Sequence, residues 1–142
     1  MRKTLIFVTC GLLCILTLIA CDKLFVGVSG KEADLQGKWQ MDEADAVFFN
    51  FQNSLFRYQG LSGRGSGTGY YTLYEDTYIE LRLLQEHTSS VLARYLSNLE
   101  WETLPSSTDN QDTITKTYHV EKLAKKKLIL SSGNERLSFH KF

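Results

Sequence analysis

Most of the chain is a succession of short segments in which apolar and polar residues alternate. In residues 46–51, for example, Val47, Phe49 and Phe51 form one face. This period of two is typical of strands, because successive side chains of a strand point to opposite sides. The pattern predicts eight strands, at residues 37–42, 46–51, 55–59, 70–74, 77–84, 113–122, 127–131 and 136–141.

The connections between these segments are mostly short and indicate antiparallel neighbours. Gly133-Asn134 predicts a two-residue hairpin, and Glu75-Asp76 another tight connection. The glycine-rich residues 60–69 are predicted to be a flexible loop. An up-and-down order of eight strands favours an all-β, antiparallel barrel, because closure removes exposed sheet edges. An open sandwich is the structural alternative.

One segment breaks the strand pattern. Residues 89–101 carry apolar residues at helical spacing, with Ser89 or Ser90 available as the N-cap. Pro105 follows. We predict one short amphipathic helix that lies across an end of the barrel.

The first twenty residues are excluded from the fold argument because they have the pattern of an export signal. Arg2 and Lys3 precede an apolar run that is too short to span a bilayer comfortably. We therefore predict a signal peptide at residues 1–20, a tether at residues 21–34, and one domain at residues 35–142.

Composition narrows the class of function. Cys10 and Cys14 lie in the predicted signal peptide, so the domain has no cysteine pair and depends on its apolar core. Without Arg2 and Lys3, 14 basic residues face 16 acidic ones, a formal charge of −2. Nucleic acid usually requires a clearly basic surface, so we expect no nucleic-acid partner. No cofactor is expected either.

Leu18, Ile19, Ala20 and Cys21 resemble the lipobox of bacterial lipoproteins. In that family a peptidase cleaves before the cysteine, which then carries diacylglycerol and usually an amide-linked acyl chain such as palmitate. The resemblance implies lipidation of Cys21 and attachment to a membrane through it, and two or three acyl chains make such attachment stable. We expect a lipid anchor in the bacterial cell envelope, at the outer membrane and facing the periplasm. An ordinary secretory signal is the alternative.

Leu35, Gly37 and Trp39 form the pattern L-x-G-x-W at the start of the first strand. With the eight-stranded meander and the closing segments at residues 126–130 and 139–141, they make the domain resemble small lipocalin-like lipoproteins of the Bacteroides group. The resemblance implies a calyx-shaped barrel that binds an apolar ligand. We expect Gly37 to allow a close approach where the chain enters the barrel, and Trp39 to plug its closed end.

Aromatic residues are the candidate ligand-binding groups. A barrel of eight strands holds either its own side chains or one small ligand. The residues expected to line the interior, as ligand contacts or as core, are Trp39, Phe49, Phe51, Tyr70, Tyr74, Tyr78 and Tyr118. Charged residues at alternate strand positions would be polar contacts wherever they point inward: Arg57, Glu80, Arg82 and Lys116.

Catalytic and metal patterns are weak. His87, His119 and His140 lack the spacing of a metal site, although His119 and Glu121 share one strand face, which His140 could neighbour. The glycine-rich segment matches no phosphate-binding motif, and no serine has a nucleophile-elbow context. We therefore predict no catalytic residues, no metal and no enzymatic activity.

Two hypotheses of function remain. In the first, the protein is a membrane-anchored barrel that binds a small apolar or amphipathic ligand. In the second, it is a protein-interaction module with a filled barrel, such as an envelope assembly component or a protease inhibitor. An open apolar mouth favours the first hypothesis. A solid interior with exposed apolar loop residues favours the second.

Overall fold

The protein was analysed as a computed structural model, which describes residues 30–44, 47–60, 63, 65–105 and 111–142. Residues 31–142 form one unit. The predicted signal peptide, Cys21 and most of the predicted tether lie outside the described residues. Among the described residues, no helix is long and apolar enough to cross a membrane.

The described elements are strands, with two short helices. In chain order they are α2 (Gly30–Leu35), β1 (Gly37–Met41), β2 (Val47–Gln52), β3 (Leu55–Gly60), β4 (Ser66–Tyr74), β5 (Tyr78–Thr88), α3 (Ser90–Asn98), β6 (Glu102–Leu104), β7 (Thr113–Leu123), β8 (Lys127–Ser132) and β9 (Glu135–Lys141). The eight predicted strands are all present.

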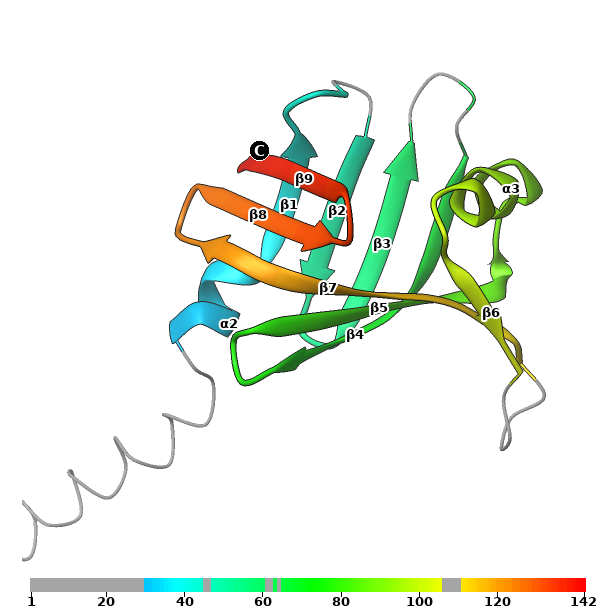
Figure 1. The fold of residues 1–142 in the computed structure, drawn as a ribbon, viewed down its shortest axis with the longest axis horizontal. Helices are drawn as coiled ribbons and strands as arrows, with labels where there is room; N and C mark the ends of the chain where they lie inside the picture. Colours follow the sequence, from blue (N-terminus) through cyan, green and yellow to red (C-terminus); the bar gives the residue numbers. More distant parts are fainter. Residues whose placement is uncertain (1–29, 45–46, 61–62, 64, 106–110) are drawn as a thin grey trace, which may run out of the picture. The chain divides into compact units, whose positions relative to one another are not determined.

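Eight of the strands close into an antiparallel barrel (Figure 1). Their order around the wall is β1-β2-β3-β4-β5-β7-β8-β9, and β9 pairs back with β1. Each of these eight strands is paired on both sides over at least part of its length, so none of them is a free edge. The predicted barrel is therefore confirmed, and the open sandwich is excluded.

The ninth strand, β6, lies outside the barrel and was not predicted. It pairs with β7 at Thr113–Thr115, whereas β8 pairs with β7 only from His119 onward. Between these two pairings, residues 116–118 of β7 are paired with β5 alone. Within the described residues, this part of β7 therefore lacks a second strand partner.

The glycine-rich segment differs from its prediction. Residues 66–69 belong to β4, where Gly67 and Gly69 are buried. A Cβ atom on Gly69 would lie 1.8 Å from the backbone oxygen of Arg82. These glycines are therefore required by the close approach of β5, and the expectation that residues 60–69 form one flexible loop is wrong for this part.

Both helices lie at ends of the barrel. Ser89 caps α3, because its hydroxyl accepts a hydrogen bond from the Leu92 amide, as predicted. α3 ends at Asn98, three residues before the predicted boundary, and Leu92 and Leu96 bury its apolar face. α2 occupies the last residues of the predicted tether, so that part of the chain is ordered as a helix.

Trp39 closes the end of the barrel at α2. Its side chain is fully buried and its indole N–H donates to the backbone oxygen of Leu35 at 2.7 Å. The Lys141 ammonium lies 4.7 Å from the centre of the Trp39 ring and donates to the Asp34 oxygen at 2.7 Å. Both donors satisfy carbonyls at the C-terminus of α2, which have no partner within the helix. Burial lowers the pKa of Lys141, a change that the charge of Asp34 opposes.

Gly37 has a different role from the one expected. A Cβ atom there would meet only ordinary contacts, the nearest at 3.7 Å from Cε of Lys141. The backbone has a φ of +113°, which side-chain-bearing residues rarely adopt. Backbone conformation, rather than close approach, therefore requires glycine at this position.

We predict that Trp39→Ala lowers the free energy of unfolding by about 3–5 kcal/mol, because it leaves a cavity and removes a buried hydrogen bond. Chemical denaturation followed by circular dichroism measures the change. Tyr74→Ala removes an exposed aromatic ring and is the matched control, expected to change stability by about 0.5 kcal/mol or less. Equal effects of the two substitutions would contradict the role assigned to Trp39.

Candidate functional site: the cavity at the open end of the barrel

The end of the barrel at α3 contains a cavity of about 360 Å³. Its floor is made by the inward-facing rings of Phe49, Tyr58 and Tyr118. Its rim is made by the β1–β2 connection, by α3 and by the β8–β9 hairpin, through Glu43, Ala44, Tyr95, Leu96, Leu99, Glu135, Arg136 and Leu137. The rest of the interior is filled by buried side chains. Among the described residues, the open space described for the interior therefore lies at this end.

Four of the seven aromatic residues predicted to line the interior do so. Trp39, Phe49, Phe51 and Tyr118 are buried in the core, and Phe49 packs edge-on against Phe51 at 6.4 Å between ring centres. Only Phe49 and Tyr118 of these four reach the cavity. Trp39 and Phe51 belong to the filled part of the barrel.

The interior placement of Tyr70, Tyr74 and Tyr78 is wrong. Their exposed fractions are 43%, 48% and 49%. On β4 the inward positions are held by Gly67, Gly69 and Tyr71, so Tyr70 and Tyr74 point outward. On β5 the inward positions begin at Ile79, which places Tyr78 outside as well.

Lys116 is the one inward-pointing residue among the four predicted polar contacts. Its side chain is 8% exposed, whereas those of Arg57, Glu80 and Arg82 lie on the outer face. The Lys116 ammonium donates to a carboxylate oxygen of Glu135 and to the backbone oxygen of Leu99, both at 2.5 Å. These contacts offset the free-energy cost of removing the Lys116 charge from water.

Tyr118 completes this polar cluster. Its hydroxyl donates to the second carboxylate oxygen of Glu135 at 3.1 Å. Burial raises the pKa of Tyr118, and the negative charge of Glu135 raises it further, so the phenol is neutral at physiological pH. Lys116, Glu135 and Tyr118 therefore place polar groups beside a cavity whose lining is mixed, with aromatic rings at its floor and charged side chains at its rim.

Trp101 was not among the predicted site residues, although it lines the cavity. Glu100 has a φ of +64°, which turns the chain after α3 and returns Trp101 to the core. The indole N–H is buried and lies near the Tyr118 hydroxyl, but within the described part of the chain it makes no hydrogen bond of normal geometry. A buried donor without a good acceptor is uncommon. The helix-like spacing up to Trp101 was a signal that this residue packs inward.

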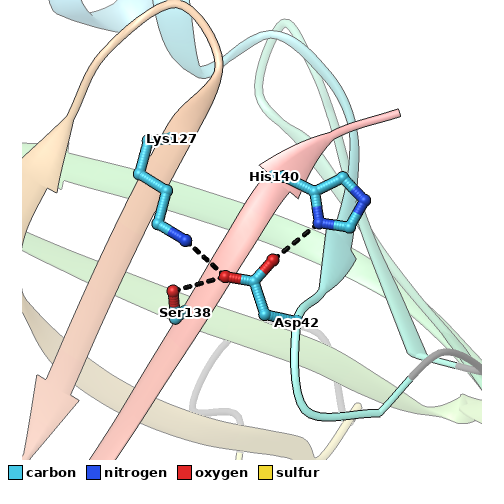
Figure 2. Close-up of polar contacts among 4 residues, drawn as sticks. All are labelled: Asp42, Lys127, Ser138 and His140. Carbon is cyan, nitrogen blue, oxygen red and sulfur yellow. Dashed lines mark hydrogen bonds and ion pairs between the residues drawn. The ribbon is translucent and has the colours of Figure 1, made fainter.

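A second charged cluster lies on the outside of the barrel, where β1 meets β9 (Figure 2). The Asp42 carboxylate accepts hydrogen bonds from Lys127, from Ser138 at 2.6 Å, and from His140 at 2.6 Å when Nδ1 carries the proton. These contacts, above all those with Lys127 and Ser138, lower the pKa of Asp42 well below its usual range. The cluster joins β1, β8 and β9 at the point of closure.

The Asp42 cluster lacks the order of a catalytic triad. Such a triad requires the histidine to lie between the serine and the carboxylate. Here Ser138 and His140 both contact the carboxylate, and no hydrogen bond joins them within the described residues. The geometry therefore favours a structural role.

The histidines do not assemble a metal site among the described residues. His119 is paired with Ser131, whereas His140 is paired with Lys127 near the other end of β8. The expected proximity of His140 to His119 and Glu121 is therefore not found.

The closed antiparallel barrel, plugged at one end and open to a small cavity at the other, defines a calyx-type β-barrel protein. Comparisons with known proteins identify the family within this class of barrel. The family model described as a lipocalin-like domain matches residues 15–142. The chain therefore belongs to the lipocalin-like family, and the resemblance predicted from the sequence is confirmed for the fold. Lipocalin-like proteins are generally non-enzymatic.

Two solved structures are similar in fold. A lipocalin-like protein from Bacteroides uniformis is 28% identical, with a TM-score of 0.57, over 77% of this chain and 99% of that chain. An uncharacterized protein from Bacteroides eggerthii is 24% identical, with a TM-score of 0.51, over 76% of this chain and 99% of that chain, and it shows similarity of fold alone. A comparison with curated proteins finds no match.

We predict that Asp42→Asn destabilises the protein by about 1 kcal/mol at pH 7, because it removes a partly exposed network of charged hydrogen bonds. Asp42 has a lowered pKa in the folded state, so its stabilising contribution is present above the ordinary value of 3.8 and is lost as the pH falls through the folded-state value. The difference in melting temperature between wild type and variant should therefore shrink below pH 3.8.

Thermal denaturation between pH 7 and pH 2 measures this difference. Asp112→Asn is the matched control, because the Asp112 side chain is exposed and makes no hydrogen bond or ion pair with the described residues. A difference for Asp42→Asn that stays constant over the whole range would contradict the assignment.

Proposed function

We propose that this protein is a non-enzymatic binding protein that holds one small apolar or amphipathic ligand in the cavity at the open end of its barrel. The observation that carries this proposal is the cavity itself. Its volume of about 360 Å³ lies within the usual range of small-molecule sites, about 300–1,000 Å³. Its floor is aromatic, and charged side chains of Glu43, Glu135 and Arg136 lie at its rim.

The shape of the cavity limits the ligand. The barrel is filled below Phe49 and Tyr118, so the apolar part of the ligand enters only as far as these rings. Glu135 and the rim residue Arg136 supply the polar contacts nearest the opening. A ligand with a short apolar body and a polar end that stays at the rim fits this arrangement better than a long, wholly apolar chain.

We also propose that the barrel is tethered to the outer membrane, on the periplasmic side, through lipid on Cys21. The support is the sequence alone: a charged start, an apolar run, and Leu18 to Cys21 in the order of a lipobox. The tether would hold the binding domain at the membrane surface, where amphipathic molecules are concentrated.

A second candidate function is the presentation of α3 to a protein partner. Val91 and Tyr95 are four residues apart on α3, and both are exposed apolar side chains. Their position favours a protein contact at the same end as the cavity. The first candidate is preferred because the cavity has both a closed floor and a polar edge.

For the binding function we predict that the purified full-length protein binds the apolar fluorophore N-phenyl-1-naphthylamine at one site, and that decanoic acid displaces it. Ala44→Phe fills the cavity and should weaken binding at least tenfold. Ala33→Phe introduces the same side chain on an exposed face of α2 and should leave binding unchanged. Fluorescence titration measures both affinities.

Absence of fluorophore binding, or equal binding by the wild type and Ala44→Phe, would contradict the ligand-binding function and favour the protein-interaction candidate. The melting temperature of Ala44→Phe serves as the control for folding.

For the tether we predict that cells expressing the protein incorporate labelled palmitate into it, and that Cys21→Ser abolishes the incorporation and releases the protein from the membrane fraction. Cys14→Ser is the matched control, because Cys14 lies within the predicted signal peptide. Labelling that persists in Cys21→Ser would show that the acyl chain is attached elsewhere.

A further inference from the structure

A second hollow, of about 400 Å³, lies on the outer face of the barrel over β2, β3, β4 and β5. It results from an irregular pairing of β4 with β5. Gly69 pairs with Leu83 and Gly67 with Thr88, so residues 84–87 of β5 lie opposite Thr68 alone. Extra residues in one strand bend it and redirect its side chains. Leu84 and His87 consequently form one wall of the hollow.

The strand register arranges the outward side chains of this hollow in two rows. In the first row Gln52 pairs with Leu55, and Leu55 pairs with Tyr70. The aliphatic side chain of Leu55 therefore lies between the Gln52 amide and the Tyr70 ring. Leu55 and Tyr70 are both substantially exposed, although both are apolar over most of their surface.

The second row is polar. Asn50 pairs with Arg57, and Arg57 pairs with Thr68. Leu55 and Arg57 are two residues apart on β3, which separates the apolar row from the guanidinium by about 7 Å along the strand. The two rows together give an apolar platform with donors and acceptors along one side.

The polar groups in this hollow have no partners among the described residues. The side chains of Asn50, Gln52, Arg57 and His87 make no hydrogen bond or ion pair with the described part of the chain. Arg136, by contrast, is paired with Glu121 at 2.9 Å. No carboxylate of the described residues lines the hollow, so none of them compensates the charge of Arg57 there.

We propose that this hollow binds an acidic saccharide, a sugar that carries a carboxylate or a sulfate. The C–H face of a sugar ring packs on aromatic and aliphatic side chains such as Tyr70 and Leu55. The amides of Asn50 and Gln52 both donate and accept, as neighbouring sugar hydroxyls require. The guanidinium of Arg57 binds a carboxylate or sulfate through paired N–H groups.

The proposal is independent of the binding function assigned to the open-end cavity. The two sites share no lining residue, because one is formed chiefly by outward side chains and the other chiefly by inward side chains and rim loops. One arginine is too little positive charge for a nucleic-acid strand, which needs several phosphate contacts. A single acidic sugar unit matches the one guanidinium that lines the hollow among the described residues.

The test uses the full-length protein in a detergent without a sugar headgroup, with trigalacturonate as the probe and isothermal titration calorimetry as the measurement. Trigalacturonate should bind, and its methyl ester and maltotriose should bind at least tenfold more weakly. Arg57→Gln and Tyr70→Ala should each weaken trigalacturonate binding at least tenfold. Two controls should leave it unchanged: Tyr74→Ala, on the same face of β4, and Arg94→Gln, on α3.

Three results would overturn the proposal. The first is failure of both trigalacturonate and an array of carboxylated and sulfated glycans to bind. The second is binding that Arg57→Gln and Tyr70→Ala leave unchanged. The third is AMP binding as tight as that of trigalacturonate. Ala44→Phe should leave saccharide binding intact, so failure of the cavity function and failure of this proposal are distinguishable.

Discussion

The burial of Trp39 at the junction of β1 and β9 is the interaction on which the rest of the structure depends. Trp39 pairs with Phe49 on one side and with Lys141 on the other, so it lies where the first and last strands of the barrel meet. Its indole N–H and the Lys141 ammonium together hold the end of α2 against the barrel. Closure of the sheet and closure of one end of the barrel are therefore achieved by the same group of side chains.

This arrangement decides where a ligand is able to enter. Because aromatic and aliphatic side chains of the described residues fill the barrel from the α2 end upward, the interior cavity lies at the α3 end. At that end residues 116–118 of β7 have a strand partner on one side only, and the inward-pointing Lys116 and Tyr118 meet Glu135 from the β8–β9 hairpin. The outer wall has a separate hollow because β5 bends away from β4. The same barrel wall thus presents a cavity with an aromatic floor inside and a separate hollow, lined by apolar and polar side chains, outside.

Much of the fold was predictable because strand periodicity and turn residues are local signals. The eight barrel strands, the hairpin at Gly133-Asn134 and the N-cap at Ser89 were each predicted from neighbouring residues. The residues of β4 that point into the barrel were not predicted. Tyr70 and Tyr71 are adjacent, so either phase places a tyrosine inside, and the true inward positions before Tyr71 are glycines, which carry no apolar signal. β6 was missed because its three residues are stabilised only by β7.

The sequence by itself determined the type and order of the strands, the position of the helix, the family resemblance and the lipobox-like segment, because each depends on residues close together in the chain. The tertiary structure decided which side chains reach the cavity, that Lys116 points inward while Arg57, Glu80 and Arg82 point outward, and that Trp101 returns to the core. Those outcomes depend on the register and bends of strands that are far apart in sequence. A shift of one residue in register exchanges the two faces of a strand, and alternation alone does not identify the inner face where both faces carry aromatic residues.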